Sequence, residues 1–175
     1  MEKDAVIART ERLILRRYEK SDLDDLYANL TDLDVVKYEP YPPMTYSEAA
    51  ENLEWRISTD EMIAVERLCD HRMIGNVYLG RRDFEALEIG YVFHKAFWGS
   101  GYAKESCEAL IARAFAGGAH RIYAECDPEN TGSWKLLEAL GFEREAHLKR
   151  NIYFWRDEQG RPIWKDTYIY AKVRD

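Results

Sequence analysis

The sequence has 175 residues, 46% of them apolar and 33% charged, which is the composition of one ordinary globular domain. Its net charge of −7 argues against a nucleic-acid binder, which needs a basic face, and either serves solubility or attracts a cationic partner. No stretch approaches the roughly 20 apolar residues of a membrane span, and the charged start Met1–Asp4 does not resemble a signal peptide. We therefore expect a cytoplasmic protein that does not act on membranes.

The first half of the chain predicts a strand, two helices and then a run of strands. Arg12–Arg17 is typical of a strand, and a serine cap at Ser21 precedes leucines at helical spacing. Thr45–Glu48 forms a capping box that opens a second helix. Three strands connected as hairpins are then expected at Met62–Leu68, Met73–Gly80 and Leu87–Phe93.

The second half alternates helices and strands. An apolar stripe predicts a helix over Ala103–Ala114, which the following glycine pair ends. A strand is expected at Arg121–Cys126, and another helix begins near Asn130 and ends before Gly141. The last two strands are expected at His147–Trp155 and Trp164–Val173, with a turn between them.

This order of elements predicts a single mixed α/β domain over residues 1–175. The early hairpins make the sheet mostly antiparallel, and the strand–helix–strand crossover in the middle adds one parallel pair. We expect a central twisted sheet with helices on both faces.

The cysteines and histidines predict neither a disulfide framework nor a metal site. Cys69, Cys107 and Cys126 are odd in number and far apart, and no Cys-x-x-Cys or His-x-x-x-His spacing occurs. Because Cys107 and Cys126 fall on the apolar sides of a helix and a strand, we expect them to fill the core.

A glycine-rich loop, Gly99-Ser100-Gly101-Tyr102-Ala103, lies between a predicted strand and a predicted helix. Glycines let the backbone approach a ligand, and the first N–H groups of the following helix point back at the loop. Such a loop either binds a phosphate or pyrophosphate, or is simply a tight turn. It lacks the full Gly-x-Gly-x-x-Gly pattern of a dinucleotide-binding domain.

Four sequence blocks together resemble the GCN5-related N-acetyltransferase (GNAT) superfamily, and in particular its RimJ/RimL-type ribosomal-protein acetyltransferases. The resemblance spans roughly residues 9–174. The blocks are Thr10 to Arg16, Gly99 to Glu105, Asn130 to Phe142, and Asp166 to Tyr170. Trp98 departs from the family pattern, because a glutamine or an arginine is usual there.

The resemblance implies that acetyl-CoA binds between the two parallel strands, which must splay near Phe93 and Asp127 to admit it. The pantetheine arm would pair with the backbone of one strand, and Gly90 is a site for a bulge that opens the sheet. Lys104 would add a cation near the phosphates, or point to solvent. The implied cofactor-binding residues are Tyr91, Val92, Phe93, Trp98, Gly99, Ser100, Gly101, Tyr102, Ala103, Lys104, Asn130 and Ser133.

Acetyl transfer to an amine needs a base, an oxyanion donor and a group near the leaving sulfur. Glu88 is the candidate base, with Glu125 and Asp127 in reserve, and the backbone near Val92 or Phe93 would supply the oxyanion donor. Ser133 would hydrogen-bond near the sulfur. On the last strand, Tyr168 is the candidate catalytic residue. We expect Tyr168 and Tyr170 on opposite faces of this strand, so that at most one of them points into the site.

The expected function is acetylation of a primary amine, either a protein N-terminus or a small molecule, by direct attack in a ternary complex. The alternative is a non-catalytic CoA-binding or regulatory module of the same fold. Aromatic residues would line an acceptor pocket, or else cover the core and a homodimer contact. They are Tyr38, Tyr41, Trp55, Tyr153, Phe154 and Trp155.

Overall fold

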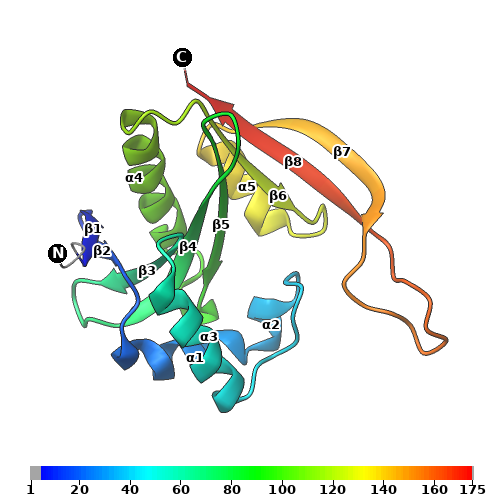
Figure 1. The fold of residues 1–175 in the computed structure, drawn as a ribbon, viewed down its shortest axis with the longest axis horizontal. Coiled ribbons are helices and arrows are strands. Elements are labelled where there is room, and N and C mark those ends of the chain that lie inside the picture. The colour runs from blue at the N-terminus through cyan, green and yellow to red at the C-terminus, as the bar shows by residue number, and fades with distance from the viewer. Residues whose placement is uncertain (1–4, 175) are drawn as a thin grey trace.

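The computed structural model describes residues 5–174, which fold around an eight-stranded sheet of order β1-β2-β3-β4-β5-β6-β8-β7. Figure 1 shows helices on both faces of the sheet and a long hairpin that extends from one edge. The strands are β1 (Val6–Arg9), β2 (Leu13–Arg16), β3 (Met62–Arg67), β4 (Met73–Arg81), β5 (Ala86–Phe93), β6 (Arg121–Cys126), β7 (Glu143–Ile152) and β8 (Lys165–Val173). The helices are α1 (Leu23–Leu30), α2 (Leu33–Val36), α3 (Tyr46–Ser58), α4 (Tyr102–Ala116) and α5 (Thr131–Ala139), with short 3-10 turns η1 (Lys20–Asp22) and η2 (Lys95–Phe97).

The sheet separates two apolar clusters. The larger one packs α4 and α5 against one face, through buried residues such as Leu110 and Leu137. The smaller one packs α1 and α3 against the other face, through Leu26 and Leu53. Because the central strands are covered on both sides, β3 is buried over most of its length instead of alternating. The predicted mixed sheet with helices on both faces is confirmed.

Two short elements were missed from the sequence, and the start of one edge strand was placed too late. The strand β1 and the short helix α2 were missed, since neither is long enough to show a period. β7 begins at Glu143 instead of His147, and it is exposed along most of its length. With no buried face, β7 carries no alternating pattern, and its position follows from pairing with β8.

The parallel pair of strands separates as expected, but without a bulge. β5 and β6 pair over only three positions, the last being Glu88 with Tyr123. Beyond that point β5 remains paired with β4, and β6 remains paired with β8, so a gap opens between β5 and β6. The β4–β5 register runs without a shift from Arg81 paired with Leu87 to Gly75 paired with Phe93. The expected bulge at Gly90 is therefore wrong, because the strands part simply by following different neighbours.

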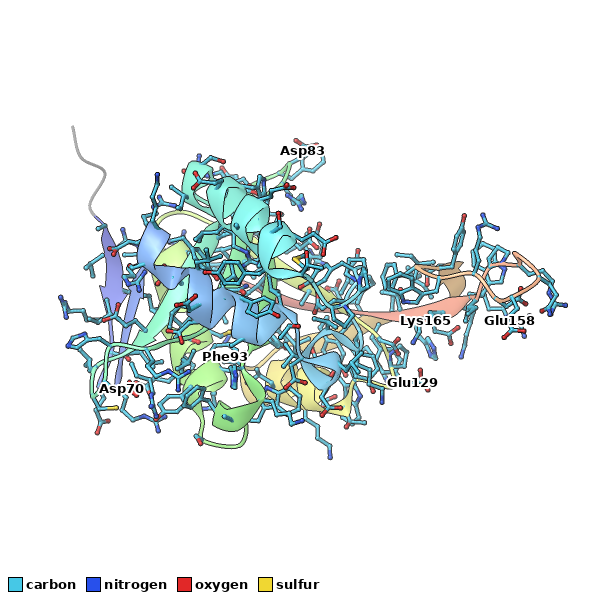
Figure 2. All side chains as sticks on the ribbon, turned by 90° about the horizontal axis from the view of Figure 1, so that it is seen from below. Asp70, Asp83, Phe93, Glu129, Glu158 and Lys165 are labelled. Atoms are coloured by element: carbon cyan, nitrogen blue, oxygen red, sulfur yellow. The ribbon has the colours of Figure 1, made fainter. Side chains whose placement is uncertain are left out.

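The β7–β8 hairpin forms an arm that projects from the body of the molecule. Figure 2 shows Glu158 at the end of this arm and Phe93 within the body. The rings of Tyr153 and Trp164 meet edge to face there, with centroids 5.2 Å apart. Tyr153 and Trp155 therefore lie on the exposed arm and do not line a buried acceptor pocket.

No helix in residues 5–174 has both the length and the apolar character that a bilayer crossing needs.

Candidate active site

Two cavities meet at the gap between β5 and β6. The first, here called the glycine-loop groove, has a volume of about 600 Å³ and lies among the end of β5, residues 98–104 and the start of α5. The second, here called the acidic pocket, has a volume of about 630 Å³ and lies among α3, β5, β6 and the base of the arm. Both are lined by Tyr38, Glu39, Tyr91, Val92 and Ser133. These five residues form the junction between the two cavities.

The glycine-rich loop presents an open helix terminus to its groove. Gly99 and Gly101 have φ values of 72° and 81°, a left-handed conformation that disfavours any side chain. Gly101 is also the N-cap of α4, and no side chain caps the helix there. The first N–H groups of α4 are therefore available to an anion, and the helix dipole favours negative charge at the same place.

A salt bridge from the turn between β1 and β2 holds this loop in place. The Arg12 Nε atom lies 2.7 Å from Glu105 Oε2, and Arg12 Nη1 donates to the Ser100 carbonyl at 2.9 Å. Thr10 Oγ1 donates to Glu105 Oε1 at 2.6 Å. Burial alone would raise the pKa of Glu105, but its bonds to Thr10 and Arg12 outweigh that effect and hold the pKa below its usual value. The first two sequence blocks of the resemblance thus touch one another, a contact that the sequence did not reveal.

The free edge of β5 faces the gap at Tyr91 and Phe93. His94 N–H donates to the Ile74 carbonyl, so the alternation of an antiparallel ladder turns the backbone of Val92 toward β4. The same alternation turns the N–H groups of Tyr91 and Phe93 toward the gap. The Phe93 carbonyl accepts a hydrogen bond from Trp98 Nε1 at 2.8 Å. An oxyanion donor at Val92 is therefore wrong, and Tyr91 and Phe93 carry the N–H groups that face the gap.

Ser133 and Tyr91 are bonded to each other at the junction. The Tyr91 hydroxyl lies 3.0 Å from Ser133 Oγ and donates to the Ser133 carbonyl at 2.9 Å. Burial raises the pKa of Tyr91 far above its usual range. Asn130 is the N-cap of α5, and its side chain accepts from the Ser133 N–H at 3.3 Å. The structure thus brings together three of the residues predicted from sequence.

Two other residues of the predicted cofactor site have different partners. Lys104 lines the groove, but its ammonium lies 2.6 Å from Glu108 one turn along the same helix. Ser100 contributes its carbonyl to Arg12. The Lys104 side chain is thus paired within its own helix, and the Ser100 carbonyl helps to fix the loop.

Glu88 lies in the acidic pocket, away from the junction. Its carboxylate is 2.5 Å from Arg82 Nη2, and it precedes Val92 by four residues, about 13 Å along a strand at ~3.3 Å per residue. The reserve candidates also lie in this pocket. Burial, together with the charge of Glu88, raises the pKa of Glu125, whereas Asp127 is paired with Lys165.

Tyr168 lies outside both cavities. Its ring packs against His147, with centroids 4.8 Å apart, and beneath the guanidinium of Arg144 at 4.4 Å. Tyr168 and Tyr170 lie on the same face of β8, with ring centroids 6.2 Å apart. The expectation of opposite faces was wrong, since residues i and i+2 of a strand always share a face.

Glu39 is the residue that sequence reasoning missed. It stands between α2 and α3 and lines both cavities. Burial raises its pKa from 4.5 to about 7, while Arg56 and Tyr41 oppose that shift. Two contacts hold its segment over the junction. Tyr38 donates to the Glu129 carbonyl at 3.1 Å, and Lys95 Nζ lies 2.5 Å from Asp34 Oδ2. The one sequence feature that could have indicated Glu39 is a single carboxylate flanked by aromatic residues, in Tyr38-Glu39-Pro40-Tyr41.

The buried cysteines are packing residues, as predicted. Cys107 and Cys126 are both buried, and burial raises their pKa values to about 12 and about 11. Among residues 5–174, no group of three or more His, Cys, Asp or Glu side chains is arranged to hold a metal ion.

Comparison with known proteins gives a consistent family. The model of the acetyltransferase (GNAT) domain matches residues 12–143. The chain is 30% identical to the uncharacterized N-acetyltransferase YnaD of Bacillus subtilis, over 95% of this chain and 96% of YnaD. A solved GNAT-family acetyltransferase from Bacillus anthracis has 29% identity and a TM-score of 0.86, covering 94% of this chain and 96% of that one.

Two solved structures of lower identity share the fold. One is the microcin C7 self-immunity acetyltransferase MccE in complex with acetyl-CoA and AMP, with 19% identity, a TM-score of 0.81 and 98% coverage of both chains. The other is the Salmonella typhimurium acetyltransferase that modifies the N-terminal serine of ribosomal protein L7/L12, with 20% identity and a TM-score of 0.80, covering 97% of this chain and 99% of that one. Together with the domain match over most of the chain, these findings establish that the protein belongs to the GNAT family of N-acetyltransferases.

Proposed function

We propose that the protein transfers an acetyl group from acetyl-CoA to a primary amine by direct attack at the junction of the two cavities. One observation carries the proposal. The gap between β5 and β6 connects a groove suited to an anionic, amide-bearing ligand with a pocket suited to an amine, and Glu39 borders both. A thioester carbonyl in the gap would then be open to attack from the acidic pocket.

The glycine-loop groove has the groups that acetyl-CoA requires. The uncapped N–H groups of α4 would bind the pyrophosphate, with the loop held in place by Arg12 and Glu105. The free backbone edge of β5 at Tyr91 would pair with the pantetheine amides, as an added strand does. Asn130 at the start of α5 would border the same arm.

The junction residues divide the chemistry of the reaction. Glu39 would accept a proton from the amine, which needs a free lone pair to attack the thioester carbonyl carbon. The N–H of Phe93 or Tyr91 would stabilise the oxyanion. As the C–N bond forms and the C–S bond breaks, the Ser133 hydroxyl would hydrogen-bond to the departing thiolate, which finally takes a proton from water. Glu88 and Tyr168 have no direct part in this scheme.

The acceptor is a protein N-terminus or a small amine. The similarity in fold to an enzyme that modifies the N-terminal serine of a ribosomal protein favours the first, and the carboxylates that line the acidic pocket suit the second.

Calorimetry followed by a turnover assay tests the proposal. We expect acetyl-CoA to bind, and thiol release to depend on an added amine when a panel of peptides and small amines is supplied. Binding without turnover on any amine would instead support the non-catalytic module. Failure to bind acetyl-CoA at high micromolar concentration would contradict both alternatives.

A further inference from the structure

The acidic pocket contains a buried cation that has no ion pair. Arg56 on α3 is 5% exposed, and it donates to Asn52 Oδ1 at 2.6 Å and to Tyr18 and Asn76 at 3.0 Å each. All three partners are neutral, and no salt bridge to Arg56 occurs within residues 5–174. A buried charge is costly unless an opposite charge compensates it, so this position favours an anionic group.

One edge of the Arg56 guanidinium is open to the pocket. Its Nε and Nη1 atoms make the three hydrogen bonds, whereas Nη2 makes none with residues 5–174. The buried polar atoms that lack a partner in this part of the chain belong to Arg17 and Asn29, so Arg56 Nη2 is not sealed in the core. Because Arg56 lines the acidic pocket, the two N–H groups of Nη2 are available to a ligand there.

This open edge lies close to the junction of the two cavities. Asn76, which accepts from Arg56, is the β4 residue that pairs with Val92 on β5. Paired residues of an antiparallel sheet present their side chains on the same face, so Arg56 lies one side chain away from Val92. Gly90, two residues before Val92, leaves room in the pocket wall. A small ligand bound at Arg56 can therefore extend to Glu39 at the junction.

Most other charged side chains of the pocket already lie in ion pairs. Glu125 is exposed, and the charges of Glu88 and Arg82 both act on it. The ion pairs join Glu88 to Arg82, Asp127 to Lys165, and Asp166 to Lys149.

Glu39 and Arg56 line the same pocket, and no salt bridge joins them. Burial raises the pKa of Glu39, and the positive charge of Arg56 opposes that rise. A ligand between these two residues would meet a negative group at the junction and a positive group beside Asn76. This arrangement suits a zwitterion. Because a zwitterion has no net charge, the other carboxylates of the pocket do not exclude it.

We infer that the acceptor is an amino acid, whose carboxylate binds Arg56 Nη2 and whose amine reacts beside Glu39. This inference rests on the proposed function, because it assigns the acceptor of that same site. The amine nitrogen forms the new C–N bond as the C–S bond of acetyl-CoA breaks, so the products are an N-acetyl amino acid, CoA and one proton. Tyr41, Trp55 and Tyr78 also line the pocket, and they suit an aromatic or apolar side chain on the acceptor.

Matched amines test the carboxylate directly in the unmodified protein. Phenylalanine and 2-phenylethylamine differ only in the carboxylate, as do leucine and 3-methylbutylamine. With saturating acetyl-CoA, we expect kcat/KM for each amino acid to exceed that for its matched amine by at least about tenfold, or about 1.4 kcal/mol. Phenylalaninamide keeps a carbonyl but has no carboxylate, and it should behave like 2-phenylethylamine.

A pair of Arg56 variants places the carboxylate. The readout is the ratio of kcat/KM for phenylalanine to that for 2-phenylethylamine, because a change in Glu39 or in folding would affect both amines alike. In Arg56→Gln this ratio should fall to about one, whereas Arg56→Lys, which keeps the charge, should retain part of it. Arg113→Gln removes the same charge from the last turn of α4, where Arg113 is exposed, and should leave the ratio unaltered.

The outcomes separate this inference from the proposed function. Turnover of 2-phenylethylamine or phenylalaninamide as efficient as that of phenylalanine would overturn the amino-acid acceptor and leave acetyl transfer intact. Turnover of a peptide that begins with serine, when no standard amino acid reacts, would overturn it as well. An unchanged ratio in Arg56→Gln would reject Arg56 as the carboxylate ligand. Acetyl-CoA binding without turnover on any of these amines would overturn the proposed function itself.

Discussion

The glycine-loop groove and the acidic pocket meet at one junction, yet they are built from different parts of the polypeptide. The groove offers mainly backbone N–H groups, from the start of α4 and the free edge of β5. The pocket offers side chains from segments far apart in the chain, including Glu39, Arg56 and Glu125. One cavity therefore depends on the path of the backbone and the other on the identity of its residues.

This difference has a consequence for recognition. A binding site made of backbone N–H groups depends little on side-chain identity, so we expect the groove to tolerate a change of side chain such as Trp98. Side-chain carboxylates can be gained or lost one at a time, so they can adapt the same fold to different acceptors. We therefore expect substitutions in the pocket to change kcat or acceptor choice, and substitutions around the groove to change acetyl-CoA affinity.

The largest effect is expected from Glu39→Gln, which removes the proposed base and preserves its shape. We expect kcat to fall about a hundredfold or more, because general base catalysis contributes typically ~10²–10⁴-fold. Acetyl-CoA affinity, measured by calorimetry, should remain within about twofold if the groove binds through its backbone.

Glu88→Gln is the matched control for that variant. Glu88 is a partly exposed carboxylate that is paired with Arg82 and lies away from the junction. We expect its substitution to change kcat by less than about threefold, as for an ordinary partly exposed ion pair. A larger loss of kcat in Glu88→Gln than in Glu39→Gln would restore Glu88 as the base and reject the junction as the site of proton transfer.

The next effect concerns the brace of the groove. Arg12→Ala removes the contacts with Glu105 and the Ser100 carbonyl, so the loop should lose its fixed position. We expect the Kd for acetyl-CoA to rise about tenfold while kcat at saturating acetyl-CoA changes little, because pre-organisation contributes to affinity. Arg12→Lys should restore part of the affinity, since lysine supplies the charge without the planar fork.

Arg9→Ala, an exposed arginine on β1, is the control for that experiment. If Arg12→Ala lowered the thermal stability but left the Kd for acetyl-CoA unchanged, Arg12 would stabilise the fold without positioning the loop.

The sequence predicted the groove better than the pocket for the same physical reason. Gly99, Gly101 and the cap Asn130 are local signals of backbone conformation, and each lies where it was expected. Glu39 reaches the junction because its loop is held by Tyr38 and Lys95 against distant segments, which no local pattern encodes. Glu88 was preferred because it lies on the strand beside the gap, but its position along β5 and its pairing with Arg82 appear only in three dimensions.

The pH dependence provides a smaller effect that separates the two cavities. A base must be unprotonated, so kcat should rise with pH through the raised pKa of Glu39, about 7. Below that value we expect about a tenfold loss per pH unit, and Glu39→Gln should abolish this limb. Acetyl-CoA affinity should be much less affected over the same range.

The pH dependence of protein stability provides a second test of the raised pKa of Glu39. Between the ordinary pKa of Glu39, 4.5, and the raised value of about 7, the folded state holds a proton that the unfolded state has lost. The free energy of unfolding should therefore fall as pH rises through this window, and less steeply in Glu39→Gln. An equal slope in both proteins would contradict burial of this carboxyl as the cause of the raised pKa.

The smallest effect is expected at Trp98, whose indole contacts the end of β5 beside the groove. Trp98→Phe keeps an aromatic ring but removes the indole N–H that binds the Phe93 carbonyl at 2.8 Å. Because a single neutral hydrogen bond contributes about 1 kcal/mol, the Kd for acetyl-CoA should rise no more than about fivefold, as calorimetry would measure. A loss above about tenfold would mean that this side chain, and not the backbone alone, forms the groove, and the contrast between the two cavities would then fail at its clearest point.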